Sequence, residues 1–143
     1  MDNKCKDPVF GDMIYKHRWQ KTETIKMFER EWNITVVAKA YSNKPISVEQ
    51  QNSYESYKNN EDKTMQRLSA KIAEYVKLFS SELESEGIKV LSLKDLSKVV
   101  KPKTLLFSQD GTAIMLLDFV LDEEHGIGID LDSLEIGNQD LFL

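Results

Sequence analysis

Apolar and polar residues alternate along the N-terminal third of the chain, as they do in strands with one buried face. The alternation is regular in residues 32–41, where Ile34 and Val36 share a face. Residues 13–17 and 19–28 follow the same pattern with charged residues interleaved. The three segments together predict an antiparallel meander.

A helical pattern follows the meander. Ser47 and Gln50 have the spacing of a capping box, which predicts the start of a helix. A second, longer helix is predicted over residues 61–86, ending at Gly87, and about 39 Å long at 1.5 Å per residue. Its apolar stripe consists of Met65, Leu68, Ile72, Tyr75, Val76, Phe79 and Leu83. One stripe predicts packing on one side only.

The C-terminal third contains the most apolar segment. Residues 112–121 are apolar on both faces, which is typical of a strand in the middle of a sheet. Residues 127–131 alternate again and predict the returning strand of a hairpin. Shorter segments predict a strand, a helical turn and two pieces of a last edge strand at residues 88–91, 93–99, 134–136 and 141–143.

These elements predict one α+β domain spanning residues 1–143. The chain has 143 residues, 41% hydrophobic and 30% charged, which suits a single packed core. The expected architecture is an antiparallel β-sheet, made of the N-terminal meander and the C-terminal hairpin, with one or two long helices packed on one face.

Charge is distributed unevenly along the chain. The net charge is -5, but residues 104–143 carry nine acidic residues and no Lys or Arg, whereas residues 1–103 carry a net +4. The overall sign argues against binding to nucleic acid or to anionic membranes. An acidic C-terminal surface would attract a basic protein partner. Alternatively, the basic helix residues neutralise that surface internally.

Other signals concern the compartment. Cys5 has no second cysteine to pair with, and the longest apolar run, residues 113–117, is far shorter than the ~20 residues needed to cross a bilayer. The polar N-terminal segment lacks the apolar core of a signal peptide. We therefore expect a cytoplasmic protein, and the motifs indicate no cofactor.

The register of the C-terminal hairpin decides which carboxylates meet. A five-residue loop would pair Leu121 with Ile127 and would place Asp118 opposite Asp130. Like charges across a ladder favour a bound cation, so Asp118, Asp130 and His125 form a hypothetical metal site. Asp132 and Glu124 would extend it. The alternative is that Asp130 and Asp132 line a solvated face while Asp118 bonds a lysine or the backbone.

Two further features have simple interpretations. Gly126 and Gly128 lack the third glycine and the following helix of a dinucleotide loop, so we expect them to allow a tight turn and the close approach of another segment. Trp19 stands among charged residues and is a candidate exposed anchor for a partner.

The sequence also resembles a known group of proteins. The residues that carry the resemblance are Phe10-Gly11, Trp19, either Gln50 or Gln51 with Tyr54 and Tyr57, and the run Glu124-His125-Gly126-Ile127-Gly128. The combination resembles small bacterial domains of unknown function that are related to the immunity proteins of polymorphic toxin systems. The resemblance implies an α+β fold and a binding role, and it supplies no active-site residues.

The expected function is therefore a non-enzymatic intracellular protein-binding module, in particular an immunity-type inhibitor that engages a basic toxin through its acidic C-terminal surface. The residues expected to contact the partner are Asp122, Glu123, Glu124, Asp130, Asp132 and Trp19. The alternative is a metal-dependent hydrolase with a site around Asp118, Asp130 and His125. A purely structural or homo-oligomeric module is a third possibility, and the sequence leaves the oligomeric state open.

Overall fold

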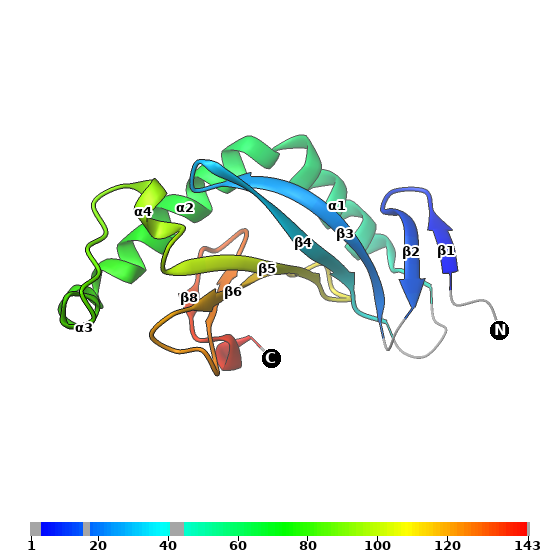
Figure 1. The fold of residues 1–143 in the computed structure, drawn as a ribbon. Helices are drawn as coiled ribbons and strands as arrows, with labels where there is room; N and C mark the ends of the chain where they lie inside the picture. The colour runs from blue at the N-terminus through cyan, green and yellow to red at the C-terminus, as the bar shows by residue number, and fades with distance from the viewer. Residues whose placement is uncertain (1–3, 16–17, 41–44, 143) are drawn as a thin grey trace.

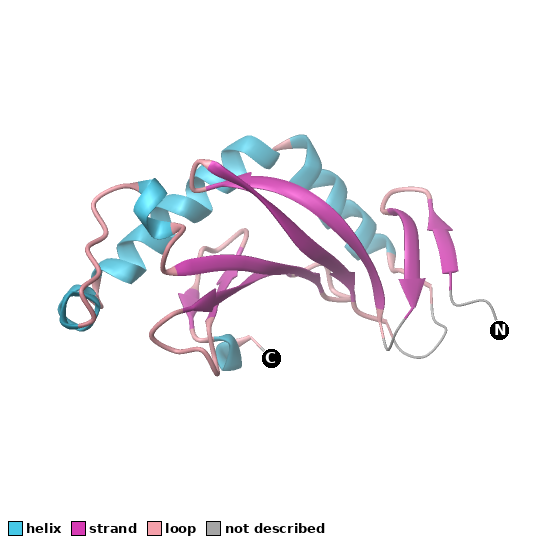
Figure 2. Ribbon diagram, in the orientation of Figure 1, coloured by secondary structure: helices cyan, strands magenta, loops and turns pink. Residues whose placement is uncertain are grey.

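The alternating segments assemble into one curved sheet with helices on one face (Figures 1 and 2). The fold is seen in a computed structural model that describes residues 4–15, 18–40 and 45–142. Its strands are β1 Lys4–Asp7, β2 Gly11–Tyr15, β3 Trp19–Met27, β4 Arg30–Ala38, β5 Val100–Phe107, β6 Ala113–Phe119, β7 Ile127–Asp130 and β8 Ile136–Gly137. Its helices are α1 Val48–Asn59, α2 Glu61–Lys77, α3 Ser80–Ser85 and α4 Leu93–Leu96, followed by a short 3-10 helix, η1 Gln139–Leu141. The predicted α+β architecture is confirmed.

The strands lie side by side in the order of the chain. Every neighbouring pair is antiparallel except β4 and β5, which are parallel. A parallel pair needs a long crossover connection, and here the connection contains all four helices. Figure 2 shows these helices along one face of the sheet. The sheet therefore consists of an N-terminal meander, β1 to β4, joined to a C-terminal meander, β5 to β8.

The core lies between the helices and the sheet. Ile34 and Val36 of β4 are buried, as the alternation predicts, and Leu68, Ile72 and Val76 of the helical stripe are buried against them in the same apolar cluster. Strand β6 runs between β5 and β7, which confirms that the most apolar segment is a central strand. No helix in the described ranges combines the length and the apolar character needed to span a bilayer.

The predicted second helix is interrupted. α2 ends at Lys77, and α3 begins at Ser80 after a tighter turn in which the Phe79 amide donates to the Val76 carbonyl at 2.9 Å. Leu83 of α3 is nevertheless buried in the core. Periodicity alone misses the interruption, because Phe79 and Leu83 keep helical spacing across it.

Other boundaries also differ from the prediction. Residues 88–91 form no strand, because they lie beside the helices, where Ile88 and Val90 pack against the core instead of a sheet edge. Strand β1 was not predicted, since its alternating Lys4 and Lys6 resemble a solvated tail. Lysines are common on edge strands because they oppose pairing with other chains. The predicted strand piece at residues 141–143 is wrong, because η1 covers Gln139–Leu141. The predicted strand ends at His17 and Tyr41, and Leu143, lie outside the described residues.

Candidate functional site

The register of the β6–β7 hairpin differs from the predicted one. Leu117 lies opposite Ile127, and Asp130 lies opposite Ile114, a shift of four residues. An even shift keeps every side chain on its predicted face, so alternation could not distinguish the two registers. The predicted pairing of Leu121 with Ile127 is therefore wrong.

The shift separates the residues of the hypothetical metal site. Asp118 lies opposite Lys101 of β5 and forms a 3.5 Å ion pair with Lys103. Asp130 lies opposite Ile114, and Asp118 is four residues further along β6. The two aspartates are therefore separated by about 13 Å along the strand direction. Asp118, Asp130 and His125 therefore do not share a site. In residues 4–15, 18–40 and 45–142, no group of three His, Cys, Asp or Glu side chains is arranged to hold a metal ion.

Asp130 and Asp132 lie at the turn between β7 and β8. One carboxylate oxygen of Asp130 accepts the backbone N–H groups of Asp132 at 2.8 Å and Ser133 at 3.1 Å, which stabilises this turn. Arg67 of α2 donates to the Asp132 carbonyl at 3.3 Å. The five acidic residues expected to form one surface are therefore divided between the two ends of β7.

The other end of β7 carries a denser group of carboxylates, which we call the acidic end: Asp122, Glu123, Glu124 and Asp140. His125 joins two of them, with its Nδ1 3.1 Å from Asp122 Oδ1 and its Nε2 3.5 Å from Asp140 Oδ2. The hydrogen bond and charge of Asp122 raise the pKa of His125 above its ordinary value, and Asp140 and Glu124 add to the rise.

The acidic end lacks the neutralisation that was considered from the sequence. Glu123 and Glu124 are exposed. Among the described residues, the ion pairs of this group involve His125 and no lysine or arginine. By contrast, Asp118 has Lys103 as its partner. The acidic end is therefore a group of carboxylates with no lysine or arginine partner among the described residues.

A C-terminal segment, which we call the strap (residues 138–142), holds this loop in place. The Gln139 amide donates to the His125 carbonyl at 3.2 Å, and its side chain donates to the Leu117 carbonyl at 3.1 Å. Gly126 has φ +60°, and the Phe142 ring lies directly against Gly128. The prediction that these glycines permit a tight turn and a close approach is confirmed.

Trp19 does not serve as an exposed anchor. Its side chain is only 8% exposed and belongs to the apolar core. Trp19 starts β3 on the same face as Ile25, which points toward the helices. Charged neighbours made it look exposed in the sequence, but two of them, Lys21 and Glu23, lie on the same face and bond Tyr54 of α1.

Sequence reasoning missed a polar network between the sheet and α1. Glu23 of β3 accepts hydrogen bonds from Tyr54 at 2.7 Å and from Lys58 at 2.8 Å, and Lys58 also pairs with Glu61 at 3.0 Å. Lys21 donates to the Phe10 carbonyl and to the Tyr54 hydroxyl. Alternation places Lys21 and Glu23 on the helix-facing side, and that inward placement of charge is the one signal that would have revealed the network.

The network is electrostatically stabilised. Burial favours the neutral form of Glu23, but hydrogen bonds from Lys58 and Tyr54 outweigh it and hold its pKa below the ordinary 4.5. Burial and the hydrogen bond to Glu23 raise the pKa of Tyr54 well above its ordinary value. The network joins β3 to α1 and to the turn after β1, so its role is to position α1.

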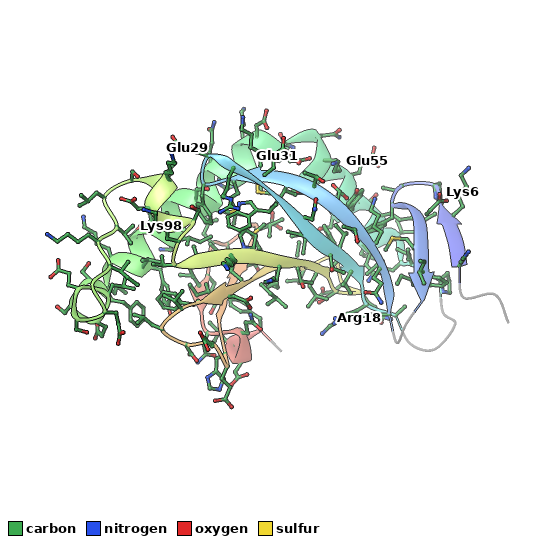
Figure 3. All side chains as sticks on the ribbon, viewed as in Figure 1. Lys6, Arg18, Glu29, Glu31, Glu55 and Lys98 are labelled. Atoms are coloured by element: carbon green, nitrogen blue, oxygen red, sulfur yellow. The ribbon has the colours of Figure 1, made fainter. Side chains whose placement is uncertain are left out.

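Replacing Glu23 by glutamine should therefore reduce the free energy of unfolding by about 1–2 kcal/mol at pH 7. Because the Glu23 pKa is lower in the folded state, its contribution is present above pH 4.5 and is lost as the pH falls through that folded pKa. Urea unfolding at several pH values measures both effects. Glu55→Gln is the matched control, because Glu55 projects from the outer side of α1 (Figure 3). Equal stability of the two variants would contradict the assignment.

Fold and surface together define a small α+β domain. Its distinctive feature is an acidic loop, between β6 and β7, to which the strap is hydrogen-bonded. The chain belongs to the family described as a domain of unknown function, DUF6985, whose model matches residues 9–143. That match includes both the strap and the loop. The comparisons with curated proteins and with solved structures find no match.

Proposed function

We propose that this chain is a non-enzymatic protein-binding domain that recognises a basic partner through the acidic end. The observation that carries the proposal is the gathering of Asp122, Glu123, Glu124 and Asp140 around a single histidine, with no lysine or arginine paired to them among the described residues. Such a concentration of one charge accelerates and orients association with an oppositely charged protein.

Within the acidic end, the residues differ in their roles. Asp122 caps its own loop, because its carboxylate accepts the His125 amide at 3.1 Å. Glu123 and Glu124 are exposed and have no such structural bond among the described residues. Their position suits contact with a partner surface, and they are the residues that we expect to dominate binding.

The specific form of the proposal is an immunity-type inhibitor that neutralises a basic toxin in the cytoplasm. Its support is the resemblance carried by Phe10-Gly11 and by the run from Glu124 to Gly128, together with the acidic charge of that run's surroundings. An inhibitor of this kind needs a rigid complementary surface. The strap bonds to Leu117 and His125 provide that rigidity at the acidic end.

The test is affinity capture with charge-reversed variants. The tagged wild-type protein and the double variant Glu123→Lys/Glu124→Lys are incubated with lysate of the source organism, and the bound proteins are identified by mass spectrometry. We expect wild type to retain a basic protein that is released by salt, and the variant to lose it. The matched control is Asp132→Lys/Glu135→Lys, which makes the same charge change at the other end of β7. Equal retention by both variants, or no basic protein on wild type, would contradict the proposal.

A further inference from the structure

The strap packs against glycines of β7 and β8 and of the loop before them. Gly126 and Gly128 lie where a side chain would overlap the strap: an added Cβ would be 2.6 Å from Gln139 Nε2 and 2.5 Å from Phe142 Cδ2, respectively. At Gly137 an added Cβ would be 3.1 Å from Leu141 Cδ2, which a small shift of that leucine would relieve. Residues 138–142 therefore have a built seat on β7 and β8, at the side of the molecule where Figure 1 shows the C-terminus.

His125 lies at the junction between this seat and the loop after β6. Its Nδ1 faces Asp122 of its own loop at 3.1 Å, and its Nε2 faces Asp140 of the strap at 3.5 Å. Glu124 is the third carboxylate whose charge acts on the ring. On the helix side, burial and the charge of Asp122 raise the pKa of Tyr75 of α2, so this phenol stays neutral near pH 7.

The two ring nitrogens of His125 behave differently when the imidazolium loses a proton. An imidazolium carries a proton on each nitrogen and can donate to both aspartates at once, whereas a neutral imidazole keeps only one. We assign the remaining proton to Nδ1, because Asp122 is the closer acceptor. Loss of the other proton leaves the Nε2 lone pair facing the Asp140 carboxylate, which removes the attraction between loop and strap.

We propose that His125 is a pH-dependent latch: the imidazolium strengthens the attachment of the strap to the loop through Asp140, and the neutral ring weakens that attachment. Weaker attachment would raise the fraction of molecules in which the Phe142 ring leaves Gly128, while the Gln139 hydrogen bonds to the His125 and Leu117 carbonyls oppose that opening. The latch concerns contacts within one chain and does not rest on the proposed partner.

The direction of the pH dependence follows from the neighbouring carboxylates. Because they raise the pKa of His125 above its ordinary 6.5, the latch contribution is fully present below pH 6.5. It is lost as the pH rises through the higher folded value. Seating of the strap should therefore weaken as the pH rises above 6.5 and through the folded pKa of His125.

Nuclear magnetic resonance on the full chain tests this directly. The Phe142 ring lies against Gly128, so the Gly128 Hα resonances report seating through their ring-current displacement and through their nuclear Overhauser contacts to the ring. We expect both signals to be strong at pH 6 and to decline with the same midpoint as the His125 ring titration. Gly128 signals that stay constant while His125 titrates would overturn the proposal.

Two substitutions distinguish the latch from a general charge effect. Asp140→Asn should lower the pKa of His125 and abolish the pH-dependent change at Gly128. Glu123→Gln removes one negative charge from the same acidic end but leaves both ring contacts of His125 in place, so the pH-dependent change at Gly128 should remain. The latch would also be contradicted if both variants kept the pH dependence at Gly128, or if both variants lost it equally.

Discussion

Replacing Gly126 by alanine is expected to destabilise the fold by about 4 kcal/mol, the largest effect of any single substitution considered for this chain. A Cβ at this position would lie 2.3 Å from the Leu117 carbonyl oxygen and 2.6 Å from the Gln139 side chain. The first contact is with backbone of the central strand, which cannot move aside without breaking its pairing with β7. The positive φ adds about 1 kcal/mol for any residue with a Cβ.

Gly87→Ala separates the cost of the positive φ from the cost of the steric overlap. Gly87 also has a positive φ, +77°, but nothing lies within 4 Å of its added Cβ. This variant should lose only about 1 kcal/mol. Urea unfolding of both variants gives the comparison. If Gly126→Ala were no more destabilising than Gly87→Ala, the close approach of Leu117 and the strap to this glycine would be wrong.

The second large effect is expected for Gln50→Ala, at about 3 kcal/mol. Gln50 is fully buried, with 0% exposure. Its side-chain amide donates to the Lys39 carbonyl at 2.7 Å and to the Phe107 carbonyl at 2.9 Å, and its oxygen accepts the Ser47 amide at 2.8 Å. One side chain thus completes the cap of α1 and joins it to the ends of the parallel strands β4 and β5.

Gln50→Leu shows which part of the loss is polar. Leucine fills most of the volume but leaves the Lys39 carbonyl without this donor, so we expect a loss of about 2 kcal/mol. Gln66→Ala is the control on an exposed face of α2 and should change stability by less than about 0.5 kcal/mol. Thermal or urea unfolding measures all three. Equal stabilities of Gln50→Leu and wild type would argue against a structural role for these hydrogen bonds.

Local patterns predicted the elements well. The capping box at Ser47 and Gln50 is present in full, because both of its hydrogen bonds form within one turn. The alternation in β4 and the apolar stripe of α2 are likewise decided by neighbours a few residues away. The sequence also indicated the acidic C-terminal charge, and Asp122, Glu123 and Glu124 do lie at one end of the sheet.

Features that depend on distant contacts were not predictable from those patterns. The hairpin register differs from the prediction by four residues, and the longer loop contacts distant segments, since the Val120 amide donates to the Val99 carbonyl and the Gln139 amide to the His125 carbonyl. Alternation does not encode such contacts. Gln50 bonds Phe107, 57 positions away, so its second role beyond capping was invisible. The separation of Asp118 from Asp130 follows from the same register and removes the basis for a metal site there.

The most direct test of the proposed function is the dissociation constant of the captured basic partner, measured by calorimetry at low and high salt. The proposal predicts that wild type and Asp132→Lys/Glu135→Lys bind with similar affinity, that Glu123→Lys/Glu124→Lys binds at least about tenfold more weakly, and that the salt dependence falls in this variant alone. Binding by Glu123→Lys/Glu124→Lys with wild-type affinity and wild-type salt dependence would contradict a binding role for the acidic end.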